Sequence, residues 1–268
     1  MTLALSILLA LLPSLAWLAL FLREDVHPEP NRLVVRAFFA GALSVLLTLP
    51  IELAALCVIP GCPPEKIGIF ESLLPGIPPG AIIVIHFFLG VALVEELMKF
   101  LFVKRLVLGN PDFDEPVDAL LYLVIGALGF AAVENILVVT NQGVQTVGLL
   151  GPGGVFMLLG ARFLSATLLH TLASGIIGYT VARALFQKTT HRWGILWGIF
   201  LATVVHGVYN ELIQLIATND RNPLLWLSLL LGLMLVTSVA LWLMLQKLRA
   251  DSRVHAWRHS GKLFTQIV

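Results

Sequence analysis

Charged residues are scarce in this sequence. Only 12% of its 268 residues are Asp, Glu, Lys or Arg, whereas 58% are hydrophobic. A soluble domain with this balance would have too little polar surface to stay dispersed in water. The composition therefore excludes an ordinary soluble protein and indicates that the lipid bilayer is the solvent of this chain.

Cysteine is scarce as well, and the chain has almost no surplus of basic charge. Cys57 and Cys62 are the two cysteines, too few for a disulfide framework and without the paired spacing of a thiolate metal site. A local extracytoplasmic disulfide between them is the alternative to two free thiols. The formal net charge is +1, and the Lys and Arg residues do not cover one broad face, so we expect no nucleic-acid partner.

Long hydrophobic runs are abundant. A helix crosses the hydrocarbon core with about 20 largely apolar residues, and the chain contains one such run after another. The runs predict an all-α fold, a polytopic transmembrane helical bundle of about seven helices, at about 2–22, 33–59, 80–103, 117–140, 154–186, 193–217 and 223–246. The first run has no basic residues before it and no small-residue cleavage site, so we expect a retained helix and not a signal peptide.

The placement of basic residues predicts the orientation. Lys and Arg in short loops stay preferentially on the cytoplasmic side. They concentrate in the first, third and fifth loops and in the tail at 247–268, whereas the alternate loops hold Lys66 and Arg221. We therefore expect a multi-pass protein of the cell membrane with a single bundle at 1–246, its N-terminus outside, and a basic cytoplasmic tail.

Ionisable residues lie inside several of these spans, where each costs several kcal/mol unless it is paired or faces a polar cavity. In the third helix, Glu95 and Lys99 are four residues apart and share a face, while Glu96 lies about 100° around the axis. One Glu can thus pair with Lys99 while the other stays free. The alternative is a simple helix-end ion pair, with Lys99 reaching the membrane border.

The next three helices carry further polar residues. Glu134 and Asn135 follow a stripe of small and aromatic residues that should face the bundle. Ser174 follows His170 at a spacing of four, and Asn210 follows His206 at the same spacing. Each pattern taken alone also fits hydrogen-bonded packing residues.

Together the four helices predict a hydrolytic site, because two carboxylates and two imidazoles near mid-membrane can converge in one cavity. Water attack on an amide needs a base, a group that stabilises the oxyanion, and an acid for the leaving amine. Glu and His supply them with or without a metal. The alternatives are a transporter or channel that uses these residues as a proton or cation relay, and an inert scaffold that retains the pocket.

At these residues the chain resembles the PrsW family of intramembrane proteases, which is related to the CAAX prenyl protease and bacteriocin-processing superfamily. The resemblance covers about 80–215, which is then the catalytic core, and lies in Glu95-Glu96-x-x-Lys99, Phe130-x-x-x-Glu134-Asn135, His170-x-x-x-Ser174-Gly175 and His206-x-x-Tyr209-Asn210. It implies an intramembrane endopeptidase that cleaves a membrane-anchored protein or peptide within the lipid bilayer. The bacterial substrate that the family suggests is an anti-sigma factor, cut on its extracytoplasmic side in a stress response.

The resemblance also suggests roles for individual residues. Glu95 or Glu96 is expected to activate water. The other residues expected in the catalytic site are Glu134, His170 and His206, supported by Lys99, Asn135, Ser174 and Asn210. Glu134 stands where the wider superfamily has a His, which keeps a metal in consideration. The expected cofactor is Zn²⁺ held by Glu134, His170 and His206 with Glu95 or Glu96, and a metal-free glutamate mechanism is the alternative.

Overall fold

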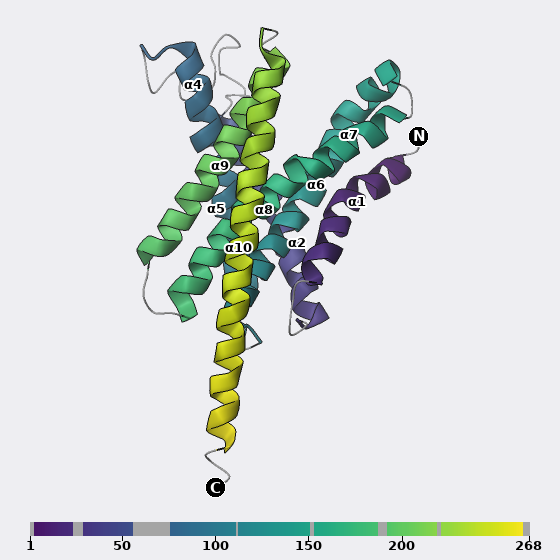
Figure 1. Cartoon of the computed structure of the whole chain (residues 1–268). Helices are drawn as coiled ribbons and strands as arrows, with labels where there is room; N and C mark the ends of the chain where they lie inside the picture. The colour runs from purple at the N-terminus through teal and green to yellow at the C-terminus, as the bar shows by residue number, and fades with distance from the viewer. Residues whose placement is uncertain are drawn as a thin grey trace.

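The structure, a computed structural model, describes residues 3–23, 29–55, 76–110, 112–150, 153–186, 192–218 and 221–264. These residues are helical apart from short connections, and no strand occurs within them. The elements are α1 (Leu3–Leu22), α2 (Asn31–Ala55), α4 (Pro79–Ile85), the π-helical segment η1 (His86–Ala92), α5 (Leu93–Leu106), α6 (Pro116–Leu150), α7 (Gly153–Leu164), α8 (Ala166–Phe186), α9 (Arg192–Thr218) and α10 (Pro223–Phe264) (Figure 1).

Six helical segments of the described chain are long and apolar enough to cross a membrane. They are Asn31–Ala55, Gly80–Leu106, Pro116–Asn141, Gly153–Phe186, Trp193–Thr218 and Pro223–Asp251. A shorter apolar stretch within α1, Ile7–Leu22, adds a seventh hydrophobic segment. The predicted all-α, polytopic transmembrane bundle is thereby confirmed.

Two of the predicted helices are divided in the structure. The helix predicted at 80–103 consists of α4, η1 and α5, which follow one another without a gap. The helix predicted at 154–186 is interrupted at Ser165, between α7 and α8. Hydrophobic periodicity does not reveal such interruptions, because a π-helical turn or a one-residue break leaves the apolar run intact.

Two other helices run past their predicted ends. Helix α6 continues to Leu150 instead of ending near 140, because Gly151 and Pro152 are the first strong breakers after it. Helix α10 continues past 246 to Phe264, since no proline interrupts the polar tail. The two cysteines, Cys57 and Cys62, lie outside the described residues, so free thiols and a local disulfide both stay open.

Helix α6 is the centre of the bundle. Every residue from Pro116 to Ala132 is buried, and α6 packs most extensively against α8, α2 and α1. Figure 1 shows these helices side by side, with the long α10 crossing in front of α8 and the two ends of the chain at opposite ends of the bundle. Glu134 and Asn135 of α6 therefore directly follow the most buried part of the bundle.

Glycine permits the close contact between α2 and α6. A β-carbon at Gly41 would lie 1.6 Å from the carbonyl oxygen of Gly126, and one at Gly129 would lie 1.8 Å from that of Phe38. Small residues of this kind let membrane helices approach until their backbones touch. The contact holds α2 against the helix that positions Glu134.

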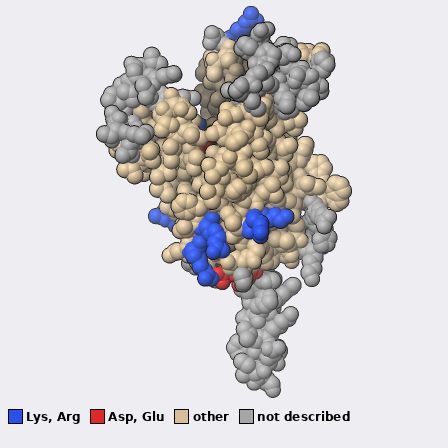
Figure 2. Space-filling view, turned by 180° about the vertical axis from the view of Figure 1, so that it is seen from behind, with Lys and Arg blue, Asp and Glu red and all other residues tan. Residues whose placement is uncertain are grey.

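The surface has an apolar belt and one basic end. Large hydrophobic side chains are exposed on α2, α9 and α10, as expected where they meet lipid. Figure 2 shows Lys and Arg gathered toward the lower end of the molecule, where α2 begins and α5 ends. Arg32 of α2 forms an ion pair there with Asp112.

We expect Gly41→Ala to destabilise the bundle, because the new methyl group would collide with the backbone of α6. Overpacking of this kind costs about 1–3 kcal/mol, and a backbone obstacle should place the loss at the upper end of that range. Gly232→Ala is the matched control, since a β-carbon there meets nothing within 4 Å. Thermal unfolding of both variants in detergent checks the expectation, and equal midpoints would contradict it.

Candidate active site

The paired glutamates of α5 hold a fully buried lysine. Lys99 Nζ lies 2.6 Å from Glu96 Oε1 and 3.3 Å from Glu95 Oε2. The Lys99 side chain is 1% exposed, so it does not extend to the membrane border. The structure thus brings both carboxylates to Lys99 and places the shorter contact on Glu96.

Glu96 is occupied by hydrogen bonds from three helices. Besides Lys99, His206 Nδ1 of α9 lies 2.9 Å from Glu96 Oε1, and Ser174 Oγ of α8 donates to Oε2 at 3.0 Å. The side chain is 0% exposed and does not line the cavity described below. Glu96 therefore joins α5, α8 and α9 and has no oxygen directed at a substrate.

The bond to Glu96 determines which nitrogen of His206 carries the proton. A carboxylate oxygen accepts hydrogen bonds, so Nδ1 of His206 is the donor. In the neutral ring the lone pair then lies on Nε2. This nitrogen is 3.9 Å from Glu95 Oε2.

His170 is oriented by two neighbours of opposite character. Its Nδ1 lies 3.0 Å from Lys99 Nζ, and an ammonium group can only donate, so Nδ1 accepts. Nε2 then carries the proton and donates it to Glu134 Oε2 at 2.8 Å. His170 Nδ1, whose lone pair accepts from Lys99, lies 3.7 Å from Glu95 Oε2, so each imidazole turns its unprotonated nitrogen toward Glu95.

Glu134 forms the second ion pair of the site. Its Oε2 lies 2.8 Å from Arg162 Nη2, and Arg162 Nε donates to the side-chain oxygen of Asn135. Asn135 in turn donates to Thr167 Oγ1 at 3.2 Å. The break at Ser165 separates Arg162, on α7, from Thr167 and His170, on α8.

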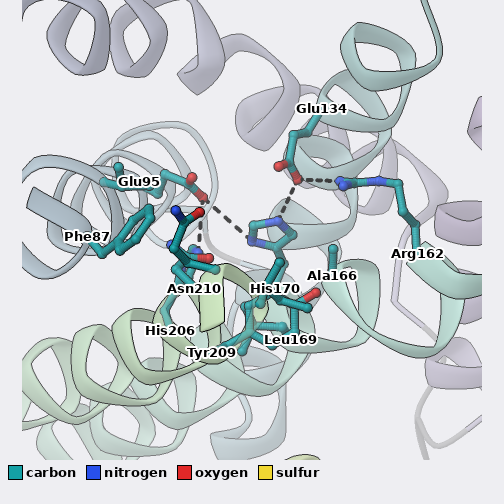
Figure 3. Close-up of a pocket in the computed structure, with 13 residues that line it drawn as sticks. Phe87, Glu95, Glu134, Arg162, Ala166, Leu169, His170, His206, Tyr209 and Asn210 are labelled. Atoms are coloured by element: carbon teal, nitrogen blue, oxygen red, sulfur yellow. Dashed lines mark hydrogen bonds and ion pairs between the residues drawn. The ribbon is translucent and has the colours of Figure 1, made fainter. Parts of the chain in front are cut away.

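Five of the residues described above line a cavity of about 290 Å³, namely Glu95, Glu134, Arg162, His170 and His206. Figure 3 shows Glu95 facing His170 and His206, and Glu134 lying between His170 and Arg162. The residues around the cavity come from η1 and from α5 to α9: Phe87, Val91, Glu95, Glu134, Arg162, Ala166, Leu169, His170, His206, Tyr209, Asn210, Ile213 and Gln214. Glu95 lines the cavity whereas Glu96 does not, a distinction that the sequence left open.

The donor set fits a metal ion. Glu95, Glu96, His170 and His206 each offer one ligand atom, and these atoms all lie within 4.8 Å of one another. Two ligands of a tetrahedral zinc ion, each about 2.0–2.2 Å from the metal, are about 3.3–3.6 Å apart, close to the 3.7 and 3.9 Å from Glu95 Oε2 to His170 Nδ1 and His206 Nε2. A metal ion at His170 Nδ1 would displace Lys99 from that nitrogen, to which it bonds here. Each imidazole also donates its other N–H to a carboxylate, as zinc-binding histidines do.

The structure places every predicted site residue around this cavity or in its immediate support. Glu134 contacts the side of His170 that faces away from Glu95 and is not part of the four-residue donor group. Asn210 lines the cavity, and its side chain makes no recorded hydrogen bond within the described part of the chain.

Two residues of the site were missed by the sequence reasoning. Arg162 was recognisable as an intramembrane charge, but nothing in its spacing connects it to Glu134. Glu52 of α2 interacts with the Glu95 carboxyl group, although α2 lies outside the predicted core at 80–215. The signal for Glu52 was its charge within a predicted span.

Comparison with known sequences identifies the family of this chain. The chain matches the sequence profile of the family described as PrsW family intramembrane metalloprotease over residues 29–244. A protein named Protease PrsW from Geobacillus kaustophilus is 33% identical over 203 residues, which are 75% of this chain and 76% of the relative. Proteins of that name from Oceanobacillus iheyensis and Bacillus subtilis are 28% and 27% identical, over 75% and 74% of this chain and 80% and 78% of their own. No solved structure matches the chain.

A bundle of membrane-spanning helices with a buried Glu and His group defines, together with these relatives, an intramembrane protease. The chain belongs to the PrsW family. The matched region includes α2, which carries Glu52, and most of α10, so the family extends on both sides of the core at 80–215.

Proposed function

We propose that the protein is an endopeptidase that hydrolyses a peptide bond of a membrane-anchored protein, with Glu95 as the group that activates water. The observation that carries this proposal is the position of Glu95. It is the member of the glutamate pair that lines the cavity, and its Oε2 lies 3.7 Å from His170 Nδ1 and 3.9 Å from His206 Nε2. Its partner Glu96 is occupied by Lys99, His206 and Ser174.

In this reaction Glu95 takes a proton from water as the oxygen attacks the peptide carbonyl, and it returns that proton to the leaving amine. Asn210, on the cavity wall, is placed to donate a hydrogen bond to the carbonyl oxygen as negative charge develops there. Lys99 balances the charge of the glutamate pair and keeps Glu96 fixed.

Zinc is the cofactor that we propose, held by Glu95, His170 and His206. A bound zinc ion polarises a carbonyl and makes water more acidic. Glu134 would then orient His170 through the bond to Nε2 and would not be a ligand. A bound cation would repel the ammonium group of Lys99. The ion pair of Lys99 Nζ with Glu96 Oε1, at 2.6 Å, would still hold it beside Glu96.

The substrate that we propose is a membrane-anchored protein, of which an anti-sigma factor is the example that the family resemblance suggests. The cavity favours such a substrate because it lies at the depth of the spans and combines apolar walls, such as Phe87 and Ile213, with the amides of Asn210 and Gln214. A transporter that used these residues as a proton or cation relay would need a continuous polar pathway through the bundle. The described part of α6 on the other side of the site, from Leu120 to Leu128, is instead buried and apolar apart from Tyr122 and Gly126.

Substitution of the two glutamates tests the proposal. We expect Glu95→Gln to abolish cleavage of a membrane-anchored reporter that carries an anti-sigma-factor transmembrane segment, with little change in the thermal midpoint. Glu96→Gln should lower activity and also cost about 3–5 kcal/mol of stability, because it leaves Lys99 buried without its main partner. Wild-type cleavage by purified, folded Glu95→Gln protein would contradict the assignment.

We also propose that the basic end of the bundle is cytoplasmic, with the N-terminus outside. After Cys57 and Cys62 are replaced by Ser, single cysteines at Gly80 and Arg105 report the two sides, since both positions are exposed and lie at opposite ends of one span. An impermeant maleimide added to intact cells should label Gly80→Cys at once and Arg105→Cys after lysis. The reverse pattern would overturn the orientation.

A further inference from the structure

Arg162 is a partly buried charge that the mechanism above does not use. It lies on the last turn of α7, its side chain is 14% exposed, and it borders the cavity. A guanidinium at membrane depth is costly unless its charge and its N–H groups are satisfied. Its charge is balanced by the ion pair with Glu134, which in turn contacts His170.

The guanidinium uses two of its nitrogens on neighbouring residues of α6. Nη2 forms the ion pair with Glu134 Oε2 at 2.8 Å, and Nε donates to Asn135. The planar fork of arginine suits this double contact, whereas the single ammonium of a lysine would satisfy one of the two residues at a time. Arg162 therefore restricts both the position of the Glu134 carboxylate and its rotation.

The same oxygen of Glu134 also receives the N–H of His170. Oε2 is 2.8 Å from Arg162 Nη2 and 2.8 Å from His170 Nε2. A carboxylate fixed in this way keeps the proton of His170 on Nε2 and its lone pair on Nδ1, which is the nitrogen that faces Glu95. Without Arg162, Glu134 could turn toward the cavity, and the Nε2 proton of His170 would lose its acceptor.

We propose that Arg162 is a positioning residue of this protease, which acts through Glu134 to hold the His170 ring with Nε2 protonated and Nδ1 facing Glu95. The proposal rests on the proposed peptidase function. Two other roles of Arg162 predict different effects of its substitution. A purely structural tie between α7 and α6 would affect stability alone, and a direct contact with the substrate would affect substrate binding.

A double-mutant cycle on the full-length protein separates these roles. The variants are Arg162→Gln, Glu134→Gln, the double variant and Arg162→Lys, assayed for kcat and KM with the anti-sigma-factor reporter and for zinc affinity by competition with a chelator, without substrate. Arg183→Gln is the matched control, a basic residue near the end of α8 and away from the cavity. It should behave as the wild type.

We expect Arg162→Gln to lower kcat, and zinc affinity where the wild type binds zinc, by about 10- to 100-fold, with KM changed less than about twofold. The double variant should be no worse than the more damaged single variant, because both substitutions interrupt one chain of contacts. Arg162→Lys should recover part of the loss, since it retains the charge opposite Glu134.

Several results would overturn the proposal. They are a wild-type kcat in Arg162→Gln, multiplicative losses in the double variant, a rise in KM alone, or a loss fully explained by the fraction of unfolded protein. A wild-type protein that neither cleaves the reporter nor binds zinc would instead reject the peptidase function and this inference with it. An active wild type with an unaffected Arg162→Gln variant rejects the role of Arg162 only.

Discussion

The buried ion pair between Lys99 and Glu96 is the interaction on which the site depends. Neither group could stay at membrane depth alone, because an unpaired charge there is too costly. Once paired, each orients one imidazole: Glu96 accepts from His206, and Lys99 donates to His170. Both rings consequently turn their unprotonated nitrogen toward Glu95, with the lone pair of His206 free and that of His170 bonded to Lys99. The Lys99–Glu96 pair thus determines which nitrogen of each histidine carries the proton.

The helices that supply these residues depart from regular α-helical geometry at two places. The π-helical segment η1 precedes the glutamate pair and contributes Phe87 and Val91 to the cavity. The break at Ser165 lies between the arginine that holds Glu134 and the histidine that Glu134 contacts. Interruptions of this kind are common at functional sites in membrane helices, where regular helical spacing would not aim all the side chains at one point.

Much of the fold and the site was predictable from the sequence, and the remainder depended on contacts between distant residues. Long apolar runs identify the spans because the bilayer imposes their length, and intramembrane charges identify the site because each needs a reason to be there. Helical spacing could not decide between Glu95 and Glu96, since the choice depends on Ser174 and His206, which are 78 and 110 residues away. The links of Arg162 to Glu134 and of Glu52 to Glu95 likewise arise only when the helices pack.

The central claim is that Glu95, His170 and His206 converge on one point where water is activated, and that zinc occupies it in the active protein. X-ray absorption at the zinc edge of the purified, active protein tests this most directly. The account predicts one zinc per chain with two imidazole nitrogens and carboxylate oxygen at about 2.0–2.2 Å, and loss of this signal in His170→Ala. A protein that cleaves its substrate while holding no stoichiometric metal, or a zinc ion with sulfur ligands, would contradict it.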